Sequence, residues 1–136
     1  MIEIENWAVP FVGYKCMTVW PFLFVRDDLM VPMRLVDYRH ENIHGRQQME
    51  VLSVGIFLAA VLFFLGCGWW SLLGLPLFFW WYVVEWFVKL IITGFSNRKA
   101  YRSISFEQEA FAFEDDSLYM KRRKPFAWIK YIFKLT

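Results

Sequence analysis

The sequence predicts a mainly α-helical membrane protein, in which a two-helix transmembrane hairpin follows a small N-terminal β element and precedes a C-terminal helical segment. Three observations lead to this prediction. Hydrophobic residues make up 58% of the 136 residues, whereas an ordinary soluble domain is about 45–50% apolar. No charged residue occurs from Val51 to Val84. Glycine and proline interrupt that run near its middle, at Gly66, Gly68 and 74–76.

The length predicts a single domain over residues 1–136, built from three segments. The first segment, 1–36, is rich in Val, Thr, Phe and Trp around the polar pair Asp27-Asp28, which predicts a β-hairpin or two short strands. Pro21 and Pro32 favour edge strands, because proline cannot donate a hydrogen bond to a neighbouring strand.

The second segment, 37–94, contains the predicted hairpin. A helix is expected to begin near Asp37 and to continue into a first span at about 49–66, followed by a second span at about 75–94. A membrane-spanning helix needs roughly 20 apolar residues, and the lipid bilayer is therefore the expected partner. The alternative is a buried helical pair in a soluble core, but so small a chain has little to cover 34 uncharged residues.

Glu85 and Lys89 interrupt the second predicted span one helical turn apart. The simpler interpretation is an ion pair near the membrane edge, with the Lys89 ammonium reaching toward water. The alternative places Glu85 near a functional site, since ionisable groups within a span are often functional.

The basic residues predict the orientation of the hairpin. Residues 1–49 contain five Lys and Arg, residues 95–136 contain nine, and the connector 66–76 contains none. The positive-inside rule therefore places both termini in the cytoplasm. The first ten residues lack a basic stretch and a cleavage site, so they do not resemble a secretory signal. A net charge of +2 is too small to indicate a nucleic-acid partner.

The third segment, 95–136, is expected to hold a short helix and a basic, aromatic tail. Ser105 and Gln108 have the spacing of a capping box, which predicts a helix over 106–114. The tail 125–134 alternates aromatic and basic residues beside the cluster 121–124, as interfacial membrane anchors do. The alternative for the cluster is a solvated patch that sets the topology.

The residues most suggestive of chemistry are His40-Glu41-Asn42-Ile43-His44, an H-E-x-x-H sequence. On a helix, His40 and His44 share one face and can bind one metal ion together. Glu41 lies about 100° around the helix from His40, where it can act on a metal-bound water as general base without binding the metal. The alternative is a pair of exposed histidines at the head of the membrane span.

A catalytic zinc site uses three protein ligands, and the chain has only 2 His and 2 Cys, Cys16 and Cys67. The third ligand is therefore expected to be a carboxylate, either Glu107 or Glu109. A two-span hairpin returns the chain to the side that it left, which brings 100–115 back beside 40–44. The helical wheel does not choose between the two glutamates, because both flank the same apolar stripe.

HENIHGRQQ and the later FEQEA resemble the gluzincin type of zinc metallopeptidase, and more narrowly small membrane-bound proteins with H-E-x-x-H-x-x-Q-Q and F-E-x-E-A. A looser likeness is to membrane zinc endopeptidases that carry E-x-x-A-D after a transmembrane hairpin. Their ligand glutamate lies three residues before the alanine, which implies Glu107 here. Phe111 stands where they have aspartate, so the carboxylate that orients a histidine is expected from Glu109 or another group.

The resulting prediction is a membrane-anchored zinc metallopeptidase with its site on the cytoplasmic side. Glu41 is the expected general base, His40, His44 and Glu107 are the expected Zn²⁺ ligands, and Glu109 is the alternative third ligand. The substrate is expected to be a peptide or protein, which the segment 21–26 could bind as an edge strand. Tyr101 or Arg102 is expected to stabilise the oxyanion.

Two other functions are compatible with the sequence. A non-enzymatic small integral membrane protein would use the apolar helices and the basic tail for a structural or interaction role. A carboxylate-bridged di-iron site would use Glu41 and His44, but such sites need two Glu-x-x-His motifs and two further glutamates. The chain contains one such motif, so a symmetric dimer would be required.

Overall fold

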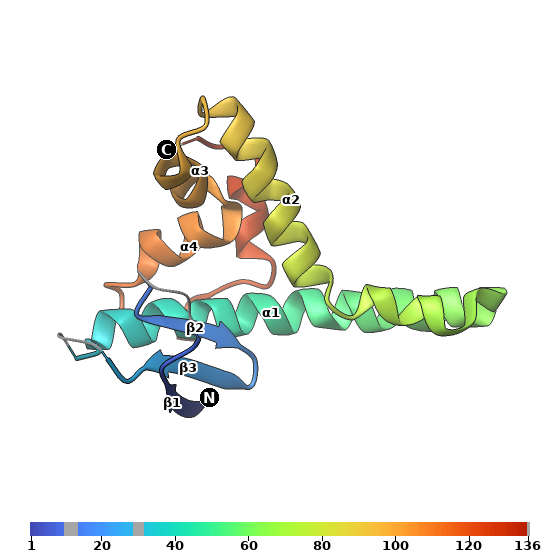
Figure 1. Cartoon of the computed structure of the whole chain (residues 1–136), viewed down its shortest axis with the longest axis horizontal. Helices are drawn as coiled ribbons and strands as arrows, with labels where there is room; N and C mark the ends of the chain where they lie inside the picture. Colours follow the sequence, from blue (N-terminus) through green and yellow to red (C-terminus); the bar gives the residue numbers. More distant parts are fainter. Residues whose placement is uncertain (10–13, 29–31, 136) are drawn as a thin grey trace.

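The computed structural model describes residues 1–9, 14–28 and 32–135. It is mainly helical with a small N-terminal sheet, as the sequence predicts (Figure 1). The elements are, in order, β1 (Ile2–Asn6), β2 (Cys16–Val19), β3 (Phe22–Arg26), α1 (Leu35–Leu62), a π-helical turn η1 (Phe63–Cys67), the 3₁₀ helix η2 (Gly68–Gly74), α2 (Leu77–Ile92), α3 (Asn97–Ser103), α4 (Ser105–Phe113), α5 (Tyr119–Arg122) and the 3₁₀ helix η3 (Ala127–Tyr131).

The three strands form a sheet in the order β1-β3-β2. β3 pairs in parallel with β1 and antiparallel with β2, so the predicted edge strand at 21–26 is in fact the centre of the sheet. The chain does turn at Asp27-Asp28, but the hairpin of this sheet is formed by β2 and β3, which are joined at Trp20-Pro21. β1, whose Ile-Glu alternation suits a half-covered strand, supplies the neighbour that makes β3 central. Residues 29–31, part of the second predicted strand, lie outside the described residues.

α1 is the longest element, and its apolar end projects beyond the rest of the molecule (Figure 1). The chain reverses near Gly66 and Gly68, whose φ angles of 88° and 55° suit glycine. η2 then packs back against α1. The two backbones approach closely at Gly55 and Gly74, since a Cβ atom on Gly55 would lie 2.4 Å from the carbonyl oxygen of Gly74.

Among the described residues, one helical segment, Leu35–Gly74, is long and apolar enough to cross a membrane. α2 has 16 residues, fewer than the roughly 20 of a full span. It leaves the end of η2 at a steep angle instead of running beside α1 (Figure 1). One long apolar segment is therefore present, and the second span of the predicted hairpin stays a prediction.

α2 turns one face toward the C-terminal part of the chain, and there the predicted Glu85–Lys89 ion pair is replaced by other contacts. The Glu85 carboxylate accepts hydrogen bonds from the backbone N–H of Ser105 at 2.9 Å and from its hydroxyl at 2.7 Å. The Lys89 ammonium donates to the carbonyls of Ile132 and Lys134 at 2.7 and 2.6 Å. Both charges thus attach α2 to later segments of the chain.

The contact with Glu85 also changes the expected start of α4. Ser105 is the first residue of α4, and its hydroxyl binds Glu85 instead of capping its own helix. The Gln108 side chain donates to the Ser103 carbonyl, so the predicted capping box does not form. A carboxylate from α2 therefore caps α4 from outside, a favourable position for negative charge at a helix N-terminus.

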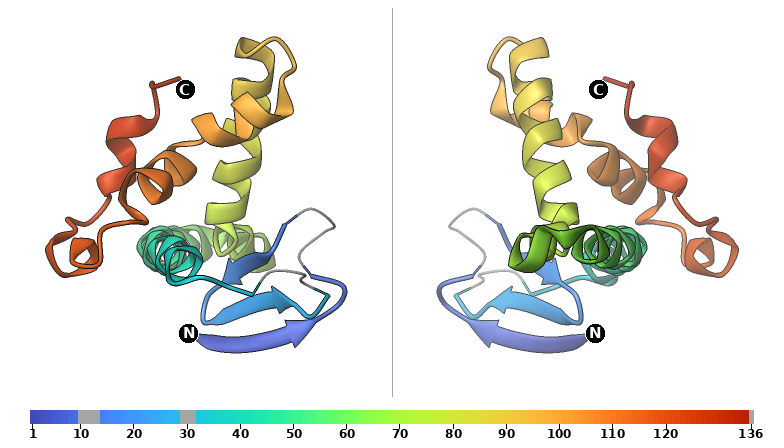
Figure 2. Two further views of the ribbon diagram at one scale, coloured as in Figure 1. Left: turned by 90° about the vertical axis from the view of Figure 1, so that its left-hand side faces the viewer. Right: turned by 90° about the vertical axis from the view of Figure 1, so that its right-hand side faces the viewer.

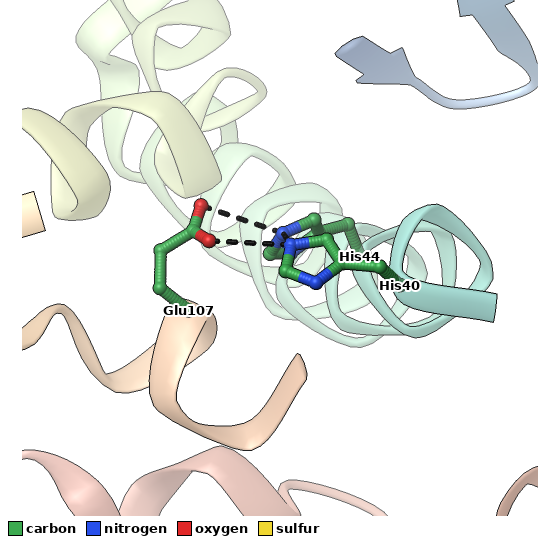
Figure 3. A group of neighbouring side chains, drawn as sticks. All are labelled: His40, His44 and Glu107. Carbon is green, nitrogen blue, oxygen red and sulfur yellow. Dashed lines mark hydrogen bonds and ion pairs between the residues drawn. The ribbon is translucent and has the colours of Figure 1, made fainter. Parts of the chain in front are cut away.

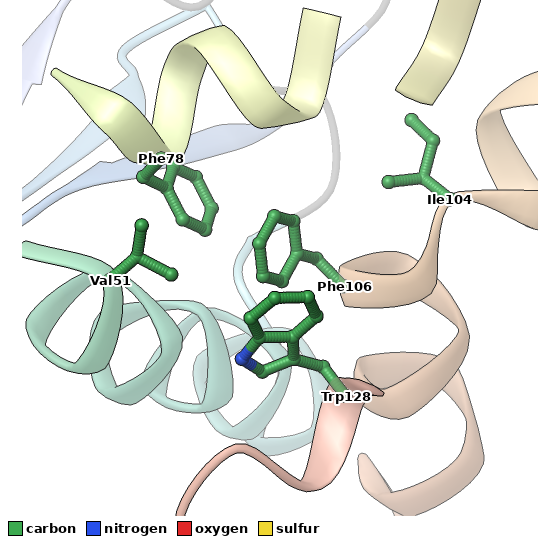
Figure 4. Close-up of a cluster of buried hydrophobic side chains, with 5 residues drawn as sticks. All are labelled: Val51, Phe78, Ile104, Phe106 and Trp128. Carbon is green, nitrogen blue, oxygen red and sulfur yellow. The ribbon is translucent and has the colours of Figure 1, made fainter. Parts of the chain in front are cut away.

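The largest apolar core lies where α1, α2, α4 and η3 meet (Figure 4). Phe106 packs with its ring centroid 4.5 Å from those of Phe78 and Trp128. Trp128 is buried, so part of the tail predicted to be an interfacial anchor packs inside the protein instead. Figure 2 shows the sheet on one side of α1, and α5 with the C-terminal segment on the other.

Candidate metal centre

His40 and His44 lie on the same face of α1, as their spacing of four residues requires. Their Nε2 atoms are 3.1 Å apart. Both imidazoles are buried, where a neutral, unpaired polar group would be destabilising. The pair of exposed histidines considered from the sequence is therefore not what the fold contains.

Glu107 on α4 completes the group, with its carboxylate pointing at both imidazoles (Figure 3). Its oxygens lie 3.3 Å from Nε2 of His40 and 3.4 Å from Nε2 of His44. In tetrahedral coordination with bonds near 2.05 Å, ligand atoms are about 3.3 Å apart. One Glu107 oxygen is near that distance from His40 and the other is near it from His44, and one ligand atom from each of the three residues lies within 4.8 Å of the others. The three side chains are therefore close enough to share one metal ion.

The outer nitrogen of each imidazole has its own partner, which determines where the ring protons sit. Nδ1 of His40 lies 2.7 Å from the Glu114 carboxylate. Nδ1 of His44 lies 2.8 Å from the side-chain oxygen of Gln47. Because both partners are acceptors, each neutral ring carries its proton on Nδ1 and directs the lone pair of Nε2 inward.

Gln47 cannot reverse its amide without losing contacts. Its nitrogen donates to the Glu109 carboxylate at 3.0 Å and to the backbone carbonyl of Phe106 at 3.1 Å. Its oxygen is therefore the atom presented to His44. Glu109, the alternative third ligand, is thus placed behind the histidine and not beside the proposed ion.

Glu109 belongs to a buried ionic cluster around Arg123. The Arg123 guanidinium forms ion pairs with Glu109 and Glu50, and the Tyr119 hydroxyl donates to Glu109 at 2.7 Å. The alternative that 121–124 is a solvated patch does not hold at Arg123, whose side chain is 4% exposed. The two carboxylates hold the pKa of Arg123 above its usual value despite its burial.

The electrostatics of the three central groups favour a cation between them. Burial alone would lower the pKa of His44, but the Glu107 carboxylate raises it to about 9. Burial opposes ionisation of Glu107, yet His44 and His40 hold the pKa of that carboxyl well below its usual range. Glu107 Oε2 is buried, and within the described chain it forms no hydrogen bond of good geometry, although Nε2 of His40 lies 3.3 Å from it. A bound metal ion would satisfy that oxygen and replace the proton on His44.

Glu41 is held at the side of the group by the N-terminal sheet. The hydroxyl of Thr18 donates to its carboxylate at 2.7 Å, and the Cys16 thiol lies 3.4 Å from the other oxygen. Burial and the negative charge of Glu41 raise the pKa of the Cys16 thiol, so this cysteine stays protonated as a donor. Glu41, His44 and Glu107 line one cavity of about 670 Å³.

Two tyrosines extend the site toward α2 and α3. The Tyr82 hydroxyl donates to Glu107 at 2.9 Å. Tyr101 lines the cavity, and burial together with the charge of Glu107 raises its pKa. Arg102 faces a different cavity and stacks on Phe111 at 5.0 Å, so its predicted role at the oxyanion is not supported. Phe111 itself packs against the His40 ring at 4.8 Å.

The strand that borders the cavity is β2, not the predicted segment 21–26. The outward edge of β2 is partly covered by Gln48. This side chain accepts from the Trp20 backbone N–H at 2.7 Å and donates to the Thr18 carbonyl at 2.6 Å. The free edge beside Glu41 is therefore confined to the first half of β2.

Several site residues were not identified from the sequence, although some left a signal. Glu114 lies seven residues after Glu107, two helical turns on, so the two fall on one face. Gln47 follows His44 by three residues for the same reason. Thr18 and Tyr82 left no signal, because only the folded chain brings them to Glu41 and Glu107.

Comparisons with protein family models, with curated proteins and with solved structures find no match to this chain. Its function is therefore inferred from the side chains of the site itself.

Proposed function

We propose that the protein is a membrane-anchored, zinc-dependent metallopeptidase. The observation that carries the proposal is the meeting of His40, His44 and Glu107 with ligand-atom separations of 3.1, 3.3 and 3.4 Å. Two histidines and one glutamate form a common ligand set of catalytic zinc. Glu41, which follows the first histidine, supplies the carboxylate that hydrolysis requires.

Zinc fits the group better than a di-iron centre does. Within the described residues, a single group of three His and Glu side chains could hold an ion. A carboxylate-bridged pair of irons needs more carboxylates than this. Glu109 and Glu50 do not supply them, because both are engaged by Arg123.

Zinc held by this group would supply an acidic water and polarise a carbonyl. The protein's own part begins with Glu41, which takes a proton as general base and passes it to the leaving amine. Thr18 keeps the carboxylate in place through the hydrogen bond at 2.7 Å. Tyr101, which shares the cavity with Glu41, is the proposed donor to the oxyanion that develops on the substrate.

The lining of the cavity indicates an apolar peptide as substrate. Phe78, Phe79, Val83 and Trp86 of α2 form the wall opposite Glu41. The open part of β2, around Cys16 and Met17, lies along the same cavity. An extended peptide could pair with that edge and place apolar side chains against α2.

The projecting end of α1 and η2 is the proposed membrane anchor. Its surface carries large apolar side chains, among them Phe64 and Trp69, which are each 87% exposed. Exposed apolar surface of this extent is typical of contact with lipid. With the basic residues concentrated outside it, we propose that the metal site lies on the cytoplasmic side.

Metal analysis of the purified full-length protein tests this proposal. We expect about one zinc per chain, which His40→Ala removes. Glu41→Gln should retain zinc and abolish cleavage of an apolar peptide library, while Glu5→Gln, an exposed strand position, should change neither. Absence of zinc, or zinc that persists in His40→Ala, would contradict the metal site. Zinc without peptide cleavage would favour the non-enzymatic alternative.

A further inference from the structure

A second cavity, of about 630 Å³, lies outside the metal centre and between α3, α4 and η3. We call it the α3 pocket. Arg98, Lys99 and Arg102 line it from α3, and Phe111 and Tyr131 add aromatic walls. Among the described residues that line the pocket there is no carboxylate. The pocket is therefore a concentration of positive charge without an internal counter-ion.

Two more cations lie on the aromatic wall of the pocket. The ammonium groups of Lys130 and Lys134 are 4.9 and 5.1 Å from the centroid of the Tyr131 ring. The guanidinium of Arg102 lies 5.0 Å from the ring of Phe111. Cation–π contacts hold such groups in place without neutralising their charge. Five like charges within one region repel each other, and a bound anion relieves that repulsion.

The nearby cluster 121–124 differs in this respect. Arg122 forms an ion pair with Asp116, and Arg123 forms ion pairs with Glu109 and Glu50. Part of the 121–124 cluster is therefore already neutralised by carboxylates. Among the described residues, the five cations around the α3 pocket form no such ion pairs. The pocket is consequently the better anion site, although the cluster is the more conspicuous one in the sequence.

Two exposed aromatic side chains are close in sequence to residues that line the pocket. Phe95, three residues before Arg98, is 74% exposed, and Phe133, two residues after Tyr131, is 96% exposed. The backbone around Phe133 is held in place, because the carbonyls of the residues on either side of it accept hydrogen bonds from Lys89. A fixed backbone that presents an aromatic ring to the outside, next to cations, is typical of contact with the membrane interface.

We propose that the α3 pocket binds the phosphate of an anionic phospholipid, with the acyl chains against Phe95 and Phe133. The cations of the pocket recognise the phosphate, a chemistry that a free phosphate ester would share. The exposed aromatic residues favour the lipid over the free ester, because only the lipid has chains to cover them. The apolar outer face of α2 ends beside Phe95, so the bound lipid would continue the proposed membrane contact.

Native mass spectrometry of the full-length protein in detergent, titrated with dioleoylphosphatidylglycerol, tests the proposal. The triple variant Arg98→Gln, Lys99→Gln, Arg102→Gln should bind this lipid about a hundredfold more weakly, since each cation near an anionic headgroup contributes roughly a factor of five. The triple variant Lys121→Gln, Arg122→Gln, Lys124→Gln removes the same charge and should change binding by less than about threefold, because screening weakens distant charges.

Further titrations distinguish the pocket from general charge attraction and the lipid from a soluble ester. Arg98→Gln alone, at an exposed position, should weaken binding about fivefold, which keeps the test valid if the triple variant misfolds. Phosphatidylcholine should bind wild type and variants alike. If the two triple variants lose lipid affinity equally, general charge attraction explains the binding, and the proposal of a specific site in the α3 pocket is refuted. If glycerol 3-phosphate displaces the lipid at equal concentration, the proposal that the ligand is a phospholipid is refuted, and a soluble phosphate ester is indicated instead.

Discussion

Gln47→Leu is the sharpest test of how the metal site is built. The substitution keeps the volume but removes the acceptor for Nδ1 of His44 and the donor to Glu109 and to the Phe106 carbonyl. Without its acceptor, the His44 ring loses the contact that selects the tautomer and the orientation. Loss of such a partner lowers metal affinity about 10–100-fold, which corresponds to roughly 1.4–2.7 kcal/mol.

Gln48→Leu is the matched control for this prediction. Gln48 is the next residue and is buried like Gln47. Its amide makes two hydrogen bonds, to β2 and to the turn that follows it. Each variant leaves buried polar groups unpaired and should lower the free energy of unfolding by about 1–3 kcal/mol. Only Gln47→Leu should weaken zinc binding.

Zinc affinity is measured by competition with a chromophoric chelator, and stability by thermal unfolding in excess EDTA. The two assays separate a loss of metal affinity from a general loss of stability. If folded Gln47→Leu binds zinc within about threefold of wild type, the proposed role of Gln47 is refuted. Equal loss of affinity in Gln48→Leu would refute it too, because a general loosening of α1 would then explain both.

Three further predictions concern packing, charge and pH. Gly55→Ala should lower the free energy of unfolding by about 1–3 kcal/mol, because the new Cβ would lie 2.4 Å from a backbone oxygen of η2. Gly45→Ala should be tolerated, because its Cβ meets a flexible side chain, and thermal unfolding compares the two variants. Arg123→Met removes the cation from the buried Glu109 and the half-buried Glu50 and should lower the free energy of unfolding by about 3–5 kcal/mol, whereas the exposed Arg122→Met should lower it by less than about 1 kcal/mol. Equal effects in denaturant titration would contradict this prediction. Zinc affinity should rise about tenfold per pH unit between pH 6 and 8, because the pKa of His44 near 9 means that the metal must displace a proton; calorimetry in buffers of different ionisation enthalpy should find about one proton released.

The meeting of the two imidazoles with Glu107 follows from the sequence because it needs only two rules. Spacing of four on a helix places His40 and His44 on one face, and a chain that leaves and returns brings α4 back to α1. The choice between Glu107 and Glu109 did not follow, since both flank the same stripe of α4. The choice is made by Arg123, which contacts Glu109 from a segment fourteen residues on.

The sequence failed where one element was judged alone. Pro21 at the start of the segment 21–26 predicts an edge strand, and nothing local to that segment indicates the pairing of β3 with the N-terminal strand β1. Ser105 has the sequence of an N-cap, yet Glu85 is closer in the fold and takes its hydroxyl. In both cases the local structure depends on a contact with a residue distant in the sequence, which the propensities of the segment itself cannot predict.

α2 has two sides with separate tasks. Tyr82 and Glu85, on one side, contact the Glu107 carboxylate and the first turn of the helix that carries it, while Val84 and Phe87, on the other side, are exposed. α2 thus links the surroundings of the protein to Glu107, the proposed metal ligand. If α2 contacts lipid as proposed, a change in bilayer thickness or lipid pressure that tilts α2 would reposition the Glu107 carboxylate and so alter the affinity of the proposed site for its ion.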